Sequence, residues 1–150
     1  MTIAFGHGLA ISPLQLASGV SAIVNGGRLV PATLINKNGG DGGAIVQKIS
    51  RVSGPNAERL VSPQNSEMMR KLLRLVVEAG TGNKADVPGY RVGGKTGTAE
   101  KSSAKGYRRK ALISSFLGVF PMDDPRYVVL AMLDEPKGTA DTFNFASGGW

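Results

Sequence analysis

Two stretches of the chain repeat apolar residues at the spacing of an α-helix. The first begins at Ser12-Pro13 and ends at Asn25-Gly26-Gly27, and the second begins at Ser62-Pro63 and ends at Gly80. Serine before proline is a typical helix start, because the serine side chain caps the first turn and proline has no N–H to leave unpaired. Glycine after the last apolar residue is a typical helix end. The pattern therefore predicts two amphipathic helices.

From Tyr90 onward the apolar residues alternate with a period of two, which is typical of strands. An earlier strand is expected at 44–52, after a glycine-rich turn at 39–43. Short connections between strands predict an antiparallel meander. The pattern therefore indicates an α+β fold with no internal repeat and no domain boundary. The meander is expected to have three strands, at Tyr90–Lys101, Ala111–Phe120 and Arg126–Glu135.

Composition excludes several classes of protein. The 150 residues contain no cysteine, which excludes a disulfide scaffold, a thiolate metal site and a cysteine nucleophile. With a single histidine, His7, we expect neither a metal nor a cofactor. His7 lies between glycines and is expected in a turn rather than as a general base. The acidic pairs Asp123-Asp124 and Asp134-Glu135 are expected to be a turn and a strand end, not an acid/base site.

Membrane segments are not expected in these residues. No apolar run reaches the roughly 18 residues that cross a bilayer. The glycines that follow Met1 also argue against a signal peptide.

The net charge of +7 is concentrated in residues 101–110. Such a run can contact phosphates, but only Tyr107 supplies an aromatic side chain there. We expect a solvated loop between two strands, and no nucleic-acid partner. A non-catalytic module that binds an anionic polymer through loop 101–110 stays open as an alternative. The basic residues are Lys101, Lys105, Arg108, Arg109 and Lys110.

The densest chemical signal is the run Gly93-Gly94-Lys95-Thr96-Gly97-Thr98. Side chains two residues apart share one face of a strand, so Thr96 and Thr98 are expected together. Lys95 is expected on the other face, unless twist at a sheet edge brings it round. A cation, two hydroxyls and a glycine-exposed backbone suit an anionic ligand such as a carboxylate or a phosphate.

Residues 89–96 also match the phosphate-loop pattern G-x-x-x-x-G-K-[ST]. The apolar run Val128–Leu133 with Asp134 and Glu135 after it imitates the strand that holds magnesium in such proteins. A phosphate loop follows a buried strand and opens a helix, whereas polar residues precede this one and no helical pattern follows it. Nucleotide binding is therefore kept only as an alternative hypothesis.

The segment Lys95-Thr96-Gly97-Thr98 resembles the K-T-G motif of penicillin-binding proteins and serine β-lactamases. An ordered set of surrounding motifs narrows the resemblance to the transpeptidase domain of class B penicillin-binding proteins, the septal and elongation D,D-transpeptidases. The resemblance covers essentially the whole chain and implies a partial transpeptidase fold of the penicillin-binding protein and serine β-lactamase type. The motifs are Phe5-Gly6-His7-Gly8, Ser12-Pro13-Leu14-Gln15-Leu16-Ala17, Asn25-Gly26-Gly27, Gly93–Lys101, Ser115-Phe116-Leu117-Gly118 with Pro121, Asp124-Pro125-Arg126 and Asp134-Glu135-Pro136-Lys137.

The resemblance implies roles for four residues. Lys95 would supply positive potential and help hold the proton network of the catalytic serine. The hydroxyls of Thr96 and Thr98 would bind the terminal carboxylate of a D-Ala-D-Ala stem peptide or of a β-lactam. The backbone N–H of Thr98 would form half of the oxyanion hole, and Gly97 would let that backbone come close to the substrate.

Two family motifs are expected upstream of Phe5, namely the S-x-x-K that carries the nucleophile and an S-x-N. Residues 1–150 contain no S-x-N, and their one S-x-x-K, Ser102–Lys105, is interpreted as chance because no apolar helix presents it. We therefore expect residues 1–150 to be the C-terminal portion of a transpeptidase domain, without its serine and its C-terminal helix, and to be inactive alone.

The resemblance also implies a setting for the parent protein. It would act at the periplasmic face of the inner membrane, with partners from the division or elongation complexes. In the family fold, strand Arg126–Glu135 pairs with an N-terminal strand that these residues lack. Its open, apolar edge predicts self-association of the fragment.

Overall fold

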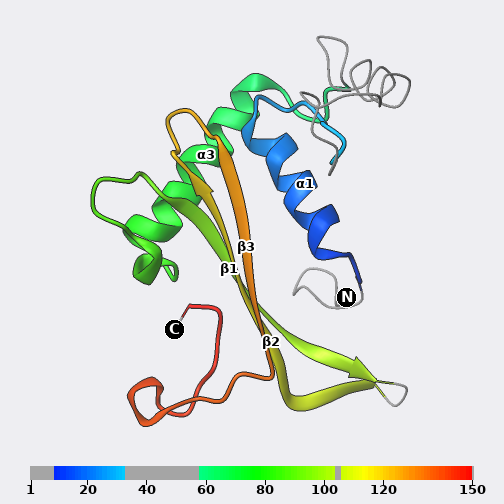
Figure 1. The fold of residues 1–150 in the computed structure, drawn as a ribbon, viewed down its shortest axis with the longest axis vertical. Coiled ribbons are helices and arrows are strands. Elements are labelled where there is room, and N and C mark those ends of the chain that lie inside the picture. The colour runs from blue at the N-terminus through cyan, green and yellow to red at the C-terminus, as the bar shows by residue number, and fades with distance from the viewer. Residues whose placement is uncertain (1–8, 33–57, 104–105, 150) are drawn as a thin grey trace, which may run out of the picture. The chain divides into compact units, whose positions relative to one another are not determined.

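The computed structural model describes residues 9–32, 58–103 and 106–149 (Figure 1). The chain divides into two compact units, one of Ser12–Arg70 and one of Met1–Ile11 with Lys71–Trp150. The division falls within the second long helix, between Arg70 and Lys71. The turn expected at 39–43, the strand expected at 44–52 and His7 lie outside the described residues.

Helix α1 of the first unit spans Pro13–Val24, as the sequence predicts. The hydroxyl of Ser12 accepts the N–H of Gln15, and the Gln15 side chain accepts the N–H of Ser12 in return, at 3.2 and 2.9 Å. This reciprocal capping box satisfies two N–H groups of the first turn. The helix ends at Asn25, and the next residue, Gly26, has a φ of +89° that favours glycine.

Helix α3 spans Pro63–Glu78, which confirms the second predicted helix. The hydroxyl of Ser62 accepts the N–H of Asn65 at 3.1 Å, the contact expected of an N-cap. Ser66 is almost fully buried, and its hydroxyl accepts the N–H of Gly26 at 3.0 Å. This bond satisfies a buried polar group and connects the end of α1 with the start of α3 inside the first unit.

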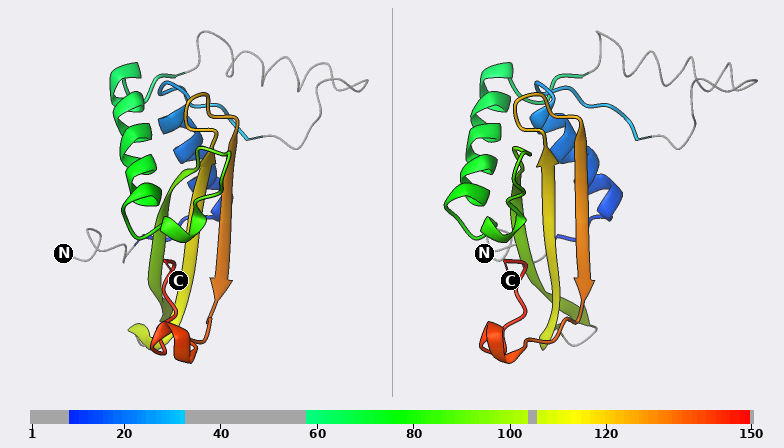
Figure 2. Two further views of the ribbon diagram at one scale, coloured as in Figure 1. Left: turned by 90° about the vertical axis from the view of Figure 1, so that its left-hand side faces the viewer. Right: turned by 60° about the vertical axis from the view of Figure 1, so that its left-hand side comes forward.

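The second unit contains an antiparallel sheet in the order β1-β2-β3, which Figure 2 shows in two further views. The strands are β1 at Gly93–Ser103, β2 at Gly106–Phe120 and β3 at Tyr127–Asp134. This confirms the predicted meander and the α+β class. The expected loop at 101–110 is wrong, because β1 and β2 continue into it as a hairpin with an irregularity between Glu100 and Ser102.

Phe116 of β2 holds the segment after α3 against β1. A Cβ on Gly82 would lie 3.1 Å from the Phe116 ring, and a Cβ on Gly94 would lie 2.4 Å from it. The ring therefore leaves no room for a Cβ at position 94 and only a tight fit for one at position 82. Gly82 belongs to the segment between α3 and β1, which includes the short 3-10 helix η2 at Asn83–Ala85.

Arg74 fixes the C-terminal part of α3 to the same segment. Its guanidinium donates to Glu78 at 2.7 Å, to Asp86 at 2.8 Å and to the carbonyl of Val92 at 2.6 Å. The hydrogen bond with Asp86, followed by that with Glu78, raises the pKa of Arg74 despite the opposing effect of burial. A permanently charged Arg74 therefore ties the end of α3 to the residue that precedes β1.

After β3 the chain forms the short helix η3, Ala140–Thr142, and then runs back along the sheet (Figure 1). The hydroxyl of Ser114 in β2, which is buried, donates to the carbonyl of Ala146. We call residues 146–149 the tail segment. Across the ranges that the structure describes, no helix is long and apolar enough to cross a membrane.

Candidate functional site

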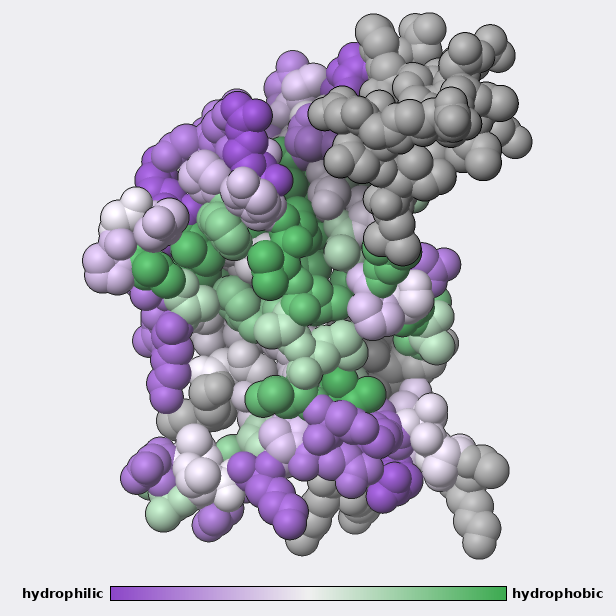
Figure 3. Space-filling view, in the orientation of Figure 1, coloured by the Kyte–Doolittle hydropathy of each residue, from purple (hydrophilic) through white to green (hydrophobic). Residues whose placement is uncertain are grey.

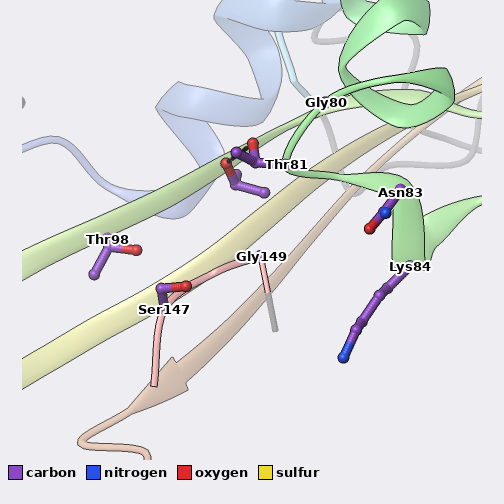
Figure 4. A pocket seen from close by; sticks show the side chains of 8 residues that line it. Gly80, Thr81, Asn83, Lys84, Thr98, Ser147 and Gly149 are labelled. Carbon is purple, nitrogen blue, oxygen red and sulfur yellow. Dashed lines mark hydrogen bonds between the residues drawn. The ribbon is translucent and has the colours of Figure 1, made fainter. Parts of the chain in front are cut away.

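A pocket of about 540 Å³ lies where β1, the segment after α3 and the tail segment meet (Figure 4). Strand β1 contributes the hydroxyls of Thr96 and Thr98 to its wall. The pocket therefore contains part of the motif that the sequence singles out. Its lining residues are Gly80, Thr81, Asn83, Lys84, Thr96, Thr98, Ser147 and Gly149.

Strand alternation places the two threonines on one face, as predicted. Thr96 is paired with Phe116 and Thr98 with Ser114 across the ladder, and both threonines line the pocket. The hydroxyls of Thr81 and Thr96 are 2.9 Å apart and share a hydrogen bond. Thr81 thus adds a third hydroxyl to those of Thr96 and Thr98, from a different segment.

Lys95 does not line the pocket, yet its ammonium group reaches the motif. Lys95 is paired with Leu117, which places it on the opposite face of β1 from the threonines. Its Nζ donates to the carbonyl of Thr96 at 2.8 Å and lies 3.5 Å from the Thr96 hydroxyl. Strict alternation therefore holds for the backbone at Lys95, and its ammonium group reaches Thr96 because the long side chain bends back toward its neighbour.

Glycine at position 97 serves packing within the sheet. A Cβ on Gly97 would lie 2.6 Å from the hydroxyl oxygen of Ser115, its partner in β2. The close backbone approach at this point comes from Gly148, whose own Cβ would lie 2.4 Å from the Gly97 carbonyl oxygen and 2.3 Å from that of Ser115. Only glycine lets the tail segment lie this close to β1 and β2.

The tail segment also contacts the motif by a hydrogen bond. The N–H of Gly148 donates to the hydroxyl of Thr98 at 3.0 Å. A hydroxyl has one hydrogen to donate, and this contact uses only an acceptor position. The hydrogen of Thr98 is consequently left for another acceptor, such as an anion in the pocket.

Most of the pocket wall does not follow from the sequence pattern. Thr81, Asn83 and Lys84 come from the segment after α3, and Ser147 and Gly149 from the tail segment. Figure 4 shows Asn83 and Lys84 on one side of the view and Thr98 and Ser147 on the other. The only sequence signal for them is a concentration of small, polar and glycine residues, which is typical of any turn.

The phosphate-loop alternative is wrong, because Lys95 and Thr96 lie inside strand β1 and open no helix. The acidic residue of that hypothesis, Asp134, accepts a hydrogen bond from Lys101 at 2.8 Å instead. No group of residues suited to hold a metal ion occurs among those that the structure describes.

Part of the basic run is neutralised by ion pairs. Lys101 donates to Asp134 and, at 3.0 Å, to Glu135, while Arg108 lies 3.2 Å from Glu135. The hydrogen bonds with Asp134 and then Glu135 raise the pKa of Lys101. The hydrogen bond and the charge of Lys101, with the charge of Arg108, lower the pKa of Glu135. These residues hold the β1–β2 hairpin to the end of β3.

Comparison with known proteins identifies the class. The family model "Penicillin binding protein transpeptidase domain" matches residues 1–147. The chain therefore belongs to the penicillin-binding-protein transpeptidase family, as its motifs indicate. The strands, helices and K-T-G segment described above thus belong to a transpeptidase fold.

Among curated relatives, the chain is 43% identical to the probable peptidoglycan D,D-transpeptidase FtsI of Caulobacter vibrioides, over 97% of this chain and 24% of that protein. It is also 43% identical to stage V sporulation protein D of Bacillus subtilis, over 92% of this chain and 21% of that protein. The chain thus spans about a quarter or less of the length of these two relatives.

Solved structures agree with this assignment. The transpeptidase domain of penicillin-binding protein 3 from Burkholderia pseudomallei has a TM-score of 0.72 and 38% identity, over 99% of this chain and 40% of that one. Penicillin-binding protein 3 from Mycobacterium tuberculosis, complexed with ampicillin, has a TM-score of 0.74 and 32% identity, over 96% of this chain and 33% of that one. The partial α+β transpeptidase fold expected from the sequence is confirmed.

Proposed function

We propose that these residues are the K-T-G-bearing, C-terminal portion of a peptidoglycan D,D-transpeptidase. The observation that carries the proposal is the pocket beside β1. The hydroxyls of Thr96 and Thr98 line this pocket, in a chain that belongs to the transpeptidase family. The protein would cross-link stem peptides through an acyl-enzyme on a serine outside these residues. Residues 1–150 alone would then be inactive.

The two threonines would bind the terminal carboxylate of the D-Ala-D-Ala stem peptide, or that of a β-lactam. Both hydroxyls lie on one face of β1, and the hydrogen of Thr98 is left to donate by the contact with Gly148. Hydroxyl donors next to an ammonium group suit a carboxylate, since hydrogen bonds to a charged group are about twice as strong as neutral ones. Gly97, between them, would let the backbone of β1 come close to the substrate.

Lys95 and the backbone of Thr98 would act on the reacting atoms. The Lys95 ammonium group lies next to the Thr96 hydroxyl and would supply positive potential to the proton network of the serine. The serine oxygen would attack the carbonyl of the penultimate residue and expel the terminal D-Ala. The Thr98 N–H would stabilise the developing oxyanion, a contribution of roughly 2.7–4 kcal/mol for one such donor.

The parent protein would work outside the cytoplasm, at the periplasmic face of the inner membrane. Proteins named as FtsI and as a sporulation protein are among its relatives, which favours a partnership with division or elongation proteins. Support for β-lactam binding comes from the ampicillin and aztreonam complexes of the M. tuberculosis relative.

The proposal is tested by acylation of the full-length protein with ampicillin. Thr98→Val keeps the shape of the side chain and removes the hydroxyl. Loss of a hydrogen bond to a carboxylate costs about 1.5–3 kcal/mol, so the second-order acylation rate should fall about ten- to hundredfold. Thr96→Val should act in the same direction.

Ser102→Ala is the matched control, because Ser102 is exposed on the same strand and outside the pocket. This variant should be acylated at the wild-type rate. An adduct that maps to Ser102, or a Thr98→Val protein acylated as fast as wild type, would contradict the proposal.

A further inference from the structure

We propose that Gly148 is a positioning residue, which directs the Thr98 hydroxyl hydrogen toward the carboxylate of the bound ligand. The inference rests on the proposed function, because it concerns the same pocket. It assigns a task to the tail segment, which no sequence motif identifies. Three contacts of the tail segment support this role.

The first contact is the hydrogen bond from the Gly148 N–H to the Thr98 hydroxyl, at 3.0 Å. Without it, an exposed threonine hydroxyl rotates between several acceptors, because a hydroxyl both donates and accepts. With it, one acceptor position is occupied by a backbone donor that a substrate carboxylate cannot replace. The hydroxyl is thereby prepared to donate, and a ligand loses less entropy in orienting it.

The second contact fixes the height of the tail segment above β1. Gly148 packs so close to the backbone of Gly97 and Ser115 that a Cβ would lie 2.4 and 2.3 Å from their carbonyl oxygens. Backbone atoms of paired strands have little room to shift. Any side chain at 148 should therefore lift the segment and lengthen or break the bond to Thr98.

The third contact anchors the segment from the other side. The hydroxyl of Ser114, which is 3% exposed, donates to the carbonyl of Ala146. Ser114 is the ladder partner of Thr98, so anchor and target lie opposite each other on β2 and β1. Removing a part-buried hydrogen bond of this kind is costly, because the carbonyl of Ala146 would lose its partner.

The test compares ampicillin with ampicillin methyl ester on the full-length protein. Gly148→Ala should lower the acylation rate with ampicillin about tenfold, the effect of one weakened hydrogen bond, and leave the ester within about twofold. In a Thr98→Val background, Gly148→Ala should cause no further loss, because the residue acts through that hydroxyl. Gly19→Ala is the control, since a Cβ there meets open space.

Equal losses with acid and ester would overturn the inference, since they indicate a merely structural role. Additive losses of Gly148→Ala and Thr98→Val would overturn it as well. If Gly148→Ala does not fold, Ser114→Ala replaces it in the comparison. We then expect a larger loss of acylation rate with ampicillin than with its methyl ester. Failure of Thr98→Val to affect ampicillin contradicts the proposed function, whereas an effect of Thr98→Val without one of Gly148→Ala contradicts only this inference.

Discussion

At the scale of single residues, the packing of the Phe116 ring positions part of the pocket wall. Its ring lies between Gly82, next to the pocket residue Thr81, and Gly94, just before the motif. The apolar contact thus places one wall of the pocket against β1. Because interiors are close-packed, a methyl group that overlaps both the ring and the fixed backbone should destabilise the protein.

We expect Gly94→Ala to destabilise the protein. The added Cβ would lie 2.4 Å from the Phe116 ring and 2.5 Å from the carbonyl oxygen of Leu117, and the backbone oxygen cannot move aside. Overpacking of this kind costs about 1–3 kcal/mol in the free energy of unfolding. The measurement is urea or thermal unfolding, together with ampicillin acylation as a readout of the pocket.

Gly118→Ala is the matched control, because Gly118 is the ladder partner of Gly94. Its Cβ would lie 3.3 Å from the same ring and 4.0 Å from the nearest backbone oxygen, so a small shift of the ring accommodates it. The reduced freedom of the unfolded chain offsets part of that cost, by about 0.4–1 kcal/mol. Equal destabilisation by the two substitutions would contradict the prediction, because only the Cβ at 94 overlaps both the Phe116 ring and the Leu117 carbonyl oxygen.

The ion pairs at the end of β3 make the β1–β2 hairpin sensitive to pH at the scale of elements. Lys101 and Arg108 lower the pKa of Glu135, so the ionised carboxylate stabilises the folded hairpin. This stabilisation is complete above the ordinary carboxyl pKa of about 4.5 and is lost as the pH falls through the lower folded-state value. The raised pKa of Lys101 means that its own contribution is lost only as the pH rises above about 10.5.

Glu135→Gln should therefore abolish the loss of protection from amide hydrogen exchange that accompanies a fall in pH. The N–H of residue 135 donates to the carbonyl of Leu112 at 2.8 Å, which makes its amide exchange a local reporter. Exchange is followed from about pH 6 to pH 3, after correction for its intrinsic pH dependence. Asp141→Asn, which removes an exposed carboxylate in η3, should leave the profile unchanged. An unaltered acid-side slope in Glu135→Gln would contradict the prediction.

Element by element, the sequence predicted what is local. Helices α1 and α3 are recognised from Ser12-Pro13 and Ser62-Pro63. In each helix the capping serine contacts an N–H within a few residues along the chain. The hairpin at 101–110 was missed, since its polar residues show no apolar alternation. Its strands are held by ladder hydrogen bonds and by pairs such as Lys101 with Asp134, far apart in sequence.

The candidate site likewise contains both local features and features set by long-range contacts. Thr96 and Thr98 were expected on one face because strand alternation is a local rule. The walls built by Thr81 and by Ser147 were missed, because they depend on long-range contacts, namely Phe116 with Gly82 and Gly148 with Thr98. Such contacts follow from tertiary packing and leave no periodic signal in the sequence.

At the scale of the whole molecule, the outer edge of β3 is the feature with the clearest consequence. Within the described sheet, β3 pairs only with β2, so its other edge carries unpaired backbone groups. Tyr127, Val129 and Leu133 of this strand are exposed by 62, 49 and 63%, and apolar side chains gather over the sheet in Figure 3. An apolar strand with an open edge is a template for pairing with another chain.

We therefore expect residues 1–150, prepared alone, to self-associate through β3. Sedimentation velocity over a range of concentrations should show dimers or larger species. The double substitution Val129→Lys and Leu133→Lys should shift the distribution toward monomer, because charges on an edge strand oppose edge-to-edge pairing. Val87→Lys, at an exposed apolar residue outside the sheet, is the control and should not shift it. A single monomeric boundary at high concentration for the unsubstituted chain would show that the β3 edge does not pair, and equal effects of the two kinds of lysine substitution would indicate a general effect of charge.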